Sequence, residues 1–484
     1  MKILHRPYFW LGLIVVLAAF LRFYRVEEYL RFLGDEGRDV LVVKHMLEGK
    51  WTLLGPTASV GGFYIGPIYY YFMLPFLWLF KLNPVGPAYM AGLFGLGLVI
   101  LTYFAVKKFF DEKIALLAAF FAAISPKLIE MYRFSWNPNP MPFFALLTIY
   151  LLYLGFDKNK KIFIVGAGIS FGVMLQLHYI DFAFAPVAGV IILILFPWRS
   201  WLANLFIFGL GTILGNSLFL IFEFRHGFPN LNSVWEFMTR NSAPVAPRQL
   251  NPVFLFDDVA RQMFDGYLGF AGKISEGIYH LSLLGFLAYV IKNRGRKLII
   301  LVAWLVIGVL GVGFYRGQLY PHYFGYLFTL PAIMLAVSVS WLWKKKILLP
   351  VAVIAIAVVS GFQIQKWFIW QKPNNLVTQV KTTDEIISGL IGDQPYNFAL
   401  IAPGNSDHGY RYFLEVLGKS PTIIDPPQKD PDRKTVTGQL VVVCEIKDCR
   451  IFGNPSWEIA GCGDGRISDS INGPAGIKIY KLVK

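Results

Sequence analysis

The chain has 484 residues, of which 56% are hydrophobic and 15% are charged, and its formal net charge is +15. Soluble domains carry about 25% charged residues, so this composition excludes a water-soluble enzyme and a disordered chain. The positive charge does not indicate nucleic-acid binding, because most lysines and arginines stand in short stretches between long apolar runs, as in the cytoplasmic loops of membrane proteins.

Eleven apolar runs are long enough to cross a bilayer core, which takes about 17 to 25 helical residues. They lie at residues 8–24, 87–106, 114–131, 140–156, 162–178, 181–197, 201–222, 276–291, 298–314, 323–343 and 347–364. Eleven crossings from a cytoplasmic N-terminus place the basic loops inside, as the positive-inside rule requires. The sequence therefore predicts a mainly α-helical, polytopic protein of the plasma membrane, with outer loops at 25–86 and 223–275.

Residues 63–82 are also apolar, but a crossing here would reverse every later loop and move the basic clusters outside. Pro67 and Pro75 interrupt the run as well. Irregular backbone at membrane depth is tolerated where it packs on protein or lines a cavity. We therefore predict a juxtamembrane or re-entrant element for this segment.

The composition changes near residue 366. Helix-like runs then alternate with strand-like runs, separated by Gly, Pro and Asp turns. The helix-like runs are 382–390 and 410–417, and the strand-like runs are 397–402, 439–445 and 477–482. We predict a transmembrane domain at 1–365 and a small extracytoplasmic α/β domain at 366–484. The tail also holds all the cysteines, Cys444, Cys449 and Cys462, which allow one disulfide, such as Cys444–Cys449, or free thiols only.

The sharpest local signal follows the first predicted span, in the sequence Gly34-Asp35-Glu36-Gly37-Arg38-Asp39. Two adjacent acids between glycines place carboxylates on flexible backbone at the membrane surface, where one could act as a general base on an incoming hydroxyl. Alternatively, Asp35 is the N-cap of the helix that follows. The oxygens of Asp35, Glu36 and Asp39 also suit a hard divalent cation. The sequence thus makes no cofactor certain and leaves open whether such a cation binds.

Other ionisable and aromatic groups gather at the predicted outer helix ends, which by default suggests a functional site at membrane depth. Arg133 could clamp a phosphate through its planar donor fork, or anchor the interface beside Trp136. His178 could be an interfacial residue whose hydrogen bonds are satisfied, or it could be a ligand. Glu223, Arg225 and His226 could be part of the site or a local ion pair that seals a helix end. Tyr69, Asn137 and His322 complete this set.

The chain has no P-loop, no GxGxxG, no HExxH and no serine elbow. ATP-driven, dinucleotide-dependent and zinc-protease chemistry are therefore disfavoured. Any reaction must use carboxylate, guanidinium, imidazole and aromatic groups.

In the order and sidedness of these features the sequence resembles the GT-C membrane glycosyltransferases. It is most similar to the bacterial branch of the protein O-mannosyltransferase family, to which lipid A aminoarabinose transferase is related. The resemblance covers about the first 345 residues. Its matching pieces are Gly34-Asp35-Glu36, residues 66–71 in place of a Pro-rich "PPLYY" element, residues 133–140, residues 222–226 and His322-Tyr323. Gly66 stands where relatives often have a second Pro or a His.

The resemblance implies inverting transfer of a sugar from a polyprenyl-phosphate carrier to a hydroxyl of a protein, lipid or glycan acceptor outside the membrane. Asp35 would be the general base, flanked by Glu36. Together with the polar residues at the outer helix ends, this predicts as substrate-binding residues Arg38, Asp39, Tyr69, Arg133, Asn137, His178, Glu223, Arg225, His226 and His322.

The main alternative is a multi-span transporter or flippase of lipid or polysaccharide. Transporters often contain inverted repeats with broken helices in matching halves and ionisable groups near the midplane. Here no repeat is found, and the ionisable groups lie at helix ends. A non-catalytic scaffold whose tail binds cell-wall polymer is a third hypothesis, but it leaves the outer acids without a role.

Overall fold

The computed structural model describes residues 7–58, 62–240, 251–315, 318–344, 358, 361, 372–463 and 465–484. The chain divides into two compact units, and each is described by itself. Unit 1 comprises Met1–Tyr24, Thr52–Phe72 and Ala88–Lys372. Unit 2 comprises Arg25–Trp51, Met73–Pro87 and Pro373–Lys484. Unit 2 therefore contains two earlier segments as well as the tail. The division into a transmembrane domain at 1–365 and an extracytoplasmic domain at 366–484 stays a prediction.

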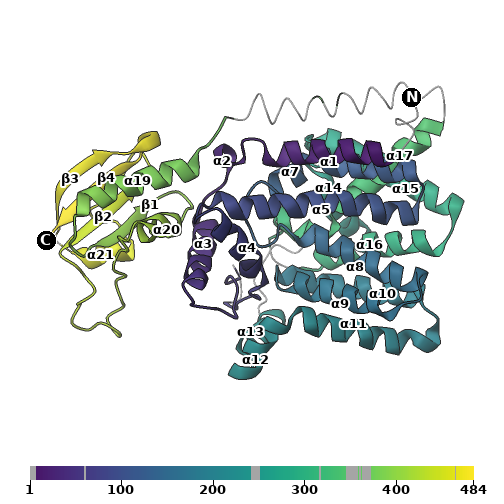
Figure 1. The fold of residues 1–484 in the computed structure, drawn as a ribbon, viewed down its shortest axis with the longest axis horizontal. Helices are drawn as coiled ribbons and strands as arrows, with labels where there is room; N and C mark the ends of the chain where they lie inside the picture. Colours follow the sequence, from purple (N-terminus) through teal and green to yellow (C-terminus); the bar gives the residue numbers. More distant parts are fainter. Residues whose placement is uncertain are drawn as a thin grey trace. The chain divides into compact units, whose positions relative to one another are not determined.

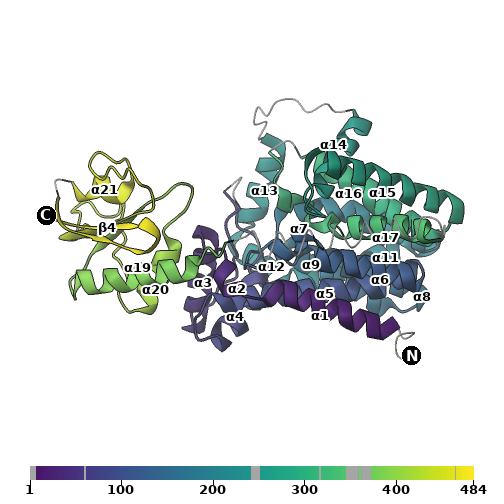
Figure 2. The same cartoon turned by 90° about the horizontal axis from the view of Figure 1, so that it is seen from above.

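Unit 1 is helical. Its longer helices run side by side with their axes roughly aligned (Figures 1 and 2). Its helices are α1 (Pro7–Phe23), α5 (Val85–Phe109), α6 (Glu112–Ile124), α7 (Pro126–Met131), α8 (Met141–Asp157), α9 (Lys161–Leu175), η1 (Tyr179–Phe184), α10 (Ala185–Leu195), η2 (Trp198–Ser200), α11 (Trp201–Gly215), α12 (Ser217–His226), α13 (Pro229–Arg240), α14 (Pro252–Phe264), α15 (Gly272–Asn293), α16 (Arg296–Gly313), η3 (Pro321–Leu327) and α17 (Thr329–Lys344). Helix α4 (Ile68–Leu79) begins in unit 1 and ends in unit 2, whereas α5 begins in unit 2.

Helices α9 and α11 pack with their backbones in direct contact. A Cβ built on Gly168 would lie 2.2 Å from the carbonyl oxygen of Phe208, and one on Gly172 would lie 2.2 Å from that of Thr212. Gly211 and Gly215 face α9 in the same way. Close approach at glycines spaced by four is a usual way for apolar helices to associate in a bilayer, where burial from water gives no driving force.

Three described helices, α5, α15 and α16, are long and apolar enough to cross a membrane. Two more candidates are bent pairs, at 78° between α11 and α12 and at 59° between η3 and α17. The first ten predicted spans each coincide with an apolar helix or a broken helix, and the eleventh, 347–364, lies outside the described residues. The mainly α-helical, polytopic class is confirmed, whereas the number of eleven spans stays a prediction.

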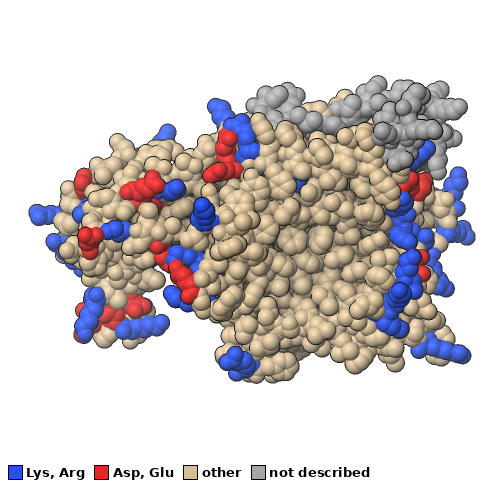
Figure 3. Space-filling view, in the orientation of Figure 1, with Lys and Arg blue, Asp and Glu red and all other residues tan. Residues whose placement is uncertain are grey.

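The side chains at the surface of unit 1 agree with this class. Its broad face in Figure 3 is almost free of charged side chains, and Lys and Arg gather at one edge of it. Large apolar side chains on α11 and α12, such as Leu202 (84% exposed) and Phe224 (71% exposed), lie mostly open at the surface of unit 1. Such a surface is stable only where lipid replaces water around it.

Unit 2 combines two segments near the start of the chain with the tail. Its sheet has the order β1-β2-β4-β3, with β1 and β2 parallel and the other pairs antiparallel. Leu440, Val442 and Ile459 belong to its apolar core. The elements wholly within unit 2 are α2 (Val26–Tyr29), α3 (Gly34–Leu47), α19 (Leu376–Ile391), β1 (Asn397–Ile401), α20 (His408–Val416), β2 (Gln439–Cys444), α21 (Trp457–Cys462), β3 (Arg466–Asn472), η6 (Pro474–Gly476) and β4 (Lys478–Val483).

The α/β character predicted for the tail is confirmed, and both helix-like and all three strand-like runs form elements of the predicted type. The sequence missed β3, because this edge strand is almost wholly exposed and lacks the alternation of apolar and polar residues that marks a half-buried strand. Of the two cysteine alternatives, the structure has the disulfide between Cys444 and Cys449, with Cys462 free and buried.

Candidate functional site

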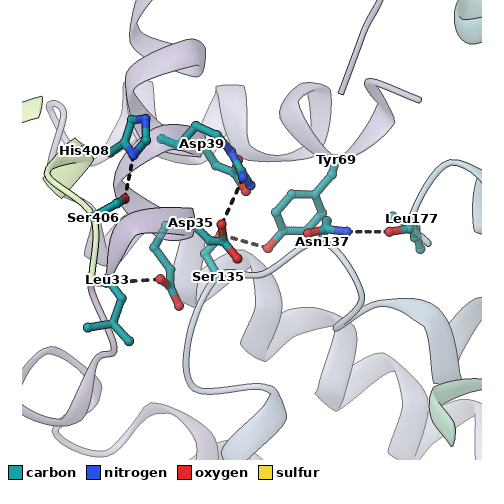
Figure 4. Close-up of polar contacts among 11 residues, drawn as sticks. Leu33, Asp35, Asp39, Tyr69, Ser135, Asn137, Leu177, Ser406 and His408 are labelled. Carbon is teal, nitrogen blue, oxygen red and sulfur yellow. Dashed lines mark hydrogen bonds and ion pairs between the residues drawn. The ribbon is translucent and has the colours of Figure 1, made fainter. Parts of the chain in front are cut away.

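The acidic pair lies in the first turn of α3. The N-cap residue is Leu33, whose backbone N–H donates to Glu36 Oε2 at 3.1 Å (Figure 4). The alternative that Asp35 is the N-cap is therefore wrong, since Asp35 lies inside the helix. Gly34 and Gly37 are also helical, and neither has a positive φ, so the predicted flexible backbone is an ordered helix start.

Arg38 joins the two aspartates of this turn. Its guanidinium contacts Asp35 Oδ1 at 2.9 Å through Nη1 and Asp39 Oδ1 at 2.8 Å through Nη2. The Asp35 side chain is 54% exposed, whereas that of Asp39 is 1% exposed. Of the three acids, Asp35 is therefore the one whose carboxylate a substrate hydroxyl can reach, and Arg38 fixes its orientation.

A divalent cation does not fit between these aspartates in this arrangement, because it would have to displace Arg38 from both carboxylates. A second group, His45, Glu48 and Glu415, places its ligand atoms within 4.8 Å of one another. The ammonium of Lys44 already pairs with both of these glutamates, at 2.5 and 2.8 Å. Neither group therefore supports a metal-assisted step.

In unit 1, imidazole and aromatic rings from three distant segments form one cluster. The ring centroid of His322 lies 4.6 Å from that of Trp136, 5.0 Å from that of His178 and 4.6 Å from that of Tyr323. The Nδ1 atom of His178 accepts the backbone N–H of Ile180 at 3.2 Å. The structure thus brings together His178 and His322, which the sequence predicted only as separate candidates.

Three predicted site residues make hydrogen bonds inside unit 1. Asn137 Nδ2 donates to the carbonyl oxygen of Leu177 at 2.5 Å, next to His178, and Tyr69 shares a hydrogen bond with Ser135 at 2.8 Å (Figure 4). The guanidinium of Arg133 donates to the carbonyl oxygens of Leu21 and Tyr24 at 2.9 Å each. Arg133 therefore caps the C-terminal end of α1, and its phosphate contact stays a prediction.

The predicted group at the end of α12 is not an ion pair within the described part of the chain. Glu223 is fully buried and accepts the side-chain amide of Asn230 at 2.7 Å and the backbone N–H of Leu231 at 2.9 Å. It thereby holds the start of α13. Arg225 and His226 are exposed, and the His226 ring shares a hydrogen bond with the carbonyl oxygen of Phe222.

Known proteins share the fold that carries these residues. Residues 65–222 match the family model of dolichyl-phosphate-mannose-protein mannosyltransferase. ArnT from Cupriavidus metallidurans, solved bound to undecaprenyl phosphate, superimposes with a TM-score of 0.67 at 13% identity over 98% of this chain and 97% of that one. This chain has the GT-C fold. The oligosaccharyltransferase of Archaeoglobus fulgidus, solved in complex with Zn and sulfate, gives a TM-score of 0.53 at 14% identity over 90% of this chain and 67% of that one.

None of the curated protein sequences matches this chain significantly. At such low identity, the structural likeness establishes the GT-C fold alone. The family resemblance predicted from the sequence is confirmed, with its sequence support in residues 65–222.

Sequence reasoning missed part of the ring cluster of this GT-C protein. The Tyr179 hydroxyl shares hydrogen bonds with those of Tyr315 and Tyr323, and the Tyr179 ring stacks on His178 at 4.4 Å. Asp181 is fully buried nearby in the sequence, and neither carboxylate oxygen has a hydrogen-bond partner among the described residues. Tyrosines at predicted helix ends also suit a membrane interface, so nothing in their spacing distinguished them.

Glu36→Gln is expected to make the thermal stability less dependent on pH. Burial raises the pKa of the Glu36 carboxyl to about 7. Because this value exceeds that of the unfolded chain, the stability that it contributes is full below about pH 4.5 and is lost as the pH rises through about 7. Glutamine can still accept the Leu33 N–H but has no proton to lose.

The measurement is the Tm in detergent at pH 5 and pH 8. Each pKa unit corresponds to about 1.4 kcal/mol. Between pH 5 and pH 8, the free energy of unfolding of the wild-type protein should therefore fall by about 3 kcal/mol more than that of the variant. The matched control is Glu27→Gln, at an exposed position of α2. Equal pH dependence in the wild type and Glu36→Gln would contradict the burial of a protonated Glu36.

Proposed function

We propose that this GT-C protein transfers a sugar, with inversion, from a polyprenyl-phosphate donor to an acceptor hydroxyl on the outer face of the plasma membrane. The observation that carries the proposal is the exposed Asp35 carboxylate. It follows the first apolar helix, is held by Arg38 and belongs to a chain with the GT-C fold. Its support also includes the undecaprenyl phosphate bound to ArnT.

In the proposed reaction, Asp35 accepts the proton of the acceptor hydroxyl as the hydroxyl oxygen attacks the anomeric carbon. The bond from this carbon to the phosphate oxygen breaks, and the polyprenyl phosphate leaves with the electron pair. A single displacement from the opposite face inverts the anomeric configuration. Arg38 aims the carboxylate, and Glu36 closes the helix turn behind it.

The leaving phosphate needs donors where its negative charge develops. We assign this task to the ring cluster of unit 1, with His322 as the main hydrogen-bond donor and His178 beside it. The half-buried ring of Trp136, next to His322, offers apolar surface for a sugar ring or the first isoprenyl unit. Arg225 and His226, exposed at the end of α12, are further candidates for the phosphate.

The test is a transfer assay with purified protein in proteoliposomes. A panel of polyprenyl-phosphate-linked sugars labelled in the sugar is combined with protein, lipid and glycan acceptors. We expect one donor to yield labelled acceptor of inverted anomeric configuration, with equimolar release of polyprenyl phosphate. Movement of an intact lipid-linked sugar between leaflets without its cleavage would instead support the transporter alternative.

A further inference from the structure

The tail of unit 2 packs directly on the helix turn that carries Asp35. A Cβ built on Gly34 would lie 2.0 Å from Ser406 Oγ, and one on Gly37 would lie 2.3 Å from the backbone nitrogen of Gly409. Real Cβ contacts are never this short. The two glycines that flank the acidic pair therefore make room for the close approach of residues 406–409. Figure 4 shows Ser406 and His408 of this segment beside the turn that carries Asp35.

The contact continues along both helices. Glu415 of α20 pairs with Lys44 Nζ at 2.8 Å and with His45 Nε2 at 2.6 Å, both near the end of α3. Before α3, the Phe32 ring packs against the rings of Tyr412 and Phe413, with centroids 6.3 and 5.6 Å away. Helix α3 is thus held by α20 at its beginning and at its end.

The segment that contacts the acidic turn is itself fixed to the sheet. Asn405 Nδ2 donates to Glu445, directly after β2, at 3.3 Å, and the Tyr410 hydroxyl donates to the same carboxylate at 2.8 Å. Ser406 Oγ shares a hydrogen bond with His408 Nδ1 at 2.7 Å. A continuous series of contacts therefore leads from β2 through residues 405–410 to the first turn of α3.

We propose that α20 is the positioning element for the general base, with Gly37 and Glu415 as positioning residues that act through α3. This inference rests on the proposed function, because it concerns the orientation of Asp35 in that reaction. The sequence resemblance does not extend to the tail, and the inference gives the tail the role of positioning the base. General-base catalysis needs the carboxylate within hydrogen-bond reach of the hydroxyl, and misplacement by about 1 Å can cost about 100-fold in rate.

The first test reverses the charges of one ion pair. Glu415→Lys faces Lys44 and His45 with a like charge, and Lys44→Glu faces Glu48 and Glu415 in the same way. Each single variant should lower kcat about 10- to 100-fold with the donor KM within about twofold of wild type, and should speed hydrogen exchange of residues 33–47. The double variant Lys44→Glu/Glu415→Lys restores the attraction between positions 44 and 415. It should therefore recover a large part of both quantities, but not all, because Glu48 still faces a like charge at position 44.

The matched control for this test is Asp393→Lys, which places a like charge beside Lys419 at a position of unit 2 where the native Asp393 side chain is 99% exposed. Both kcat and the exchange of residues 33–47 should keep their wild-type values in this variant. A change equal to that of Glu415→Lys would mean that any altered ion pair of the tail lowers activity, and would overturn the proposal.

The second test uses alanine in place of glycine. Gly37→Ala places a Cβ against the backbone of Gly409 and should lower kcat by a similar factor. Its control is Gly389→Ala, in helix α19, where nothing lies within 4 Å of the added carbon. If Gly37→Ala fails to fold, the charge-reversal series still decides.

Wild-type kcat in both single reversals, or faster exchange in α3 without loss of kcat, would overturn the inference. Failure of the double variant to recover would also overturn it. A wild-type protein that transfers no sugar from any donor would instead refute the proposed function. Failure of the inference is therefore seen in the variants, whereas failure of the proposed function is seen in the wild-type protein.

Discussion

Replacing Asp35 with Asn is expected to reduce sugar transfer by about 10²- to 10⁴-fold, the usual cost of losing a general base. The amide keeps the shape of the carboxylate, and its oxygen can still accept a hydrogen bond from Arg38, but it cannot take the proton of the acceptor. Because Leu33 and not Asp35 is the N-cap of α3, the substitution removes no helix cap. The folded state and the affinity for the donor should therefore change little.

The measurement is the single-turnover rate in proteoliposomes, together with the binding of labelled polyprenyl phosphate and the Tm. Asp469→Asn, on the exposed strand β3, is the matched control and should behave as wild type. A folded Asp35→Asn variant with near-normal turnover would exclude Asp35 as the base. Glu36 and Asp39 would then be the remaining acids of this turn.

Replacing His322 with Ala is expected to raise the donor KM and to lower kcat/KM for the donor about 10- to 100-fold. A hydrogen bond to a charged group contributes about 1.5–3 kcal/mol, and each 1.4 kcal/mol corresponds to a factor of ten. The imidazole lies against Trp136 and His178, which fix its place in the cluster. The acceptor KM should stay unchanged.

The matched control is His280→Ala. His280 is exposed on α15 and pairs with Asp257 at 3.2 Å, away from the ring cluster in sequence and contacts. Donor titrations of the wild type and both variants decide the question. Equal donor KM values in all three would remove the cluster from the phosphate site, and Arg225 and His226 would be tested next.

The sequence alone determined the class of the protein, its chain of apolar helices and the type of its tail. These features depend on local composition: a run of about 20 apolar residues has one favourable environment, and alternating short runs with Gly and Pro turns have a limited set of folds. The order of motifs also identified the GT-C resemblance, and it selected His178, His322 and the acidic turn.

Only the tertiary structure decided what these residues contact. Arg133 and Glu223 are candidates for a site by chemistry, yet their hydrogen bonds hold α1 and the start of α13. The glycines of the acidic turn suggested mobility, yet Gly34 makes room for Ser406 and Gly37 for the backbone of Gly409, about 370 residues later in the chain. A sequence specifies which groups a residue can bind, but contacts between distant segments depend on how the whole chain packs. For this reason the role of Gly37 and the meeting of His178 with His322 became visible only in the folded protein.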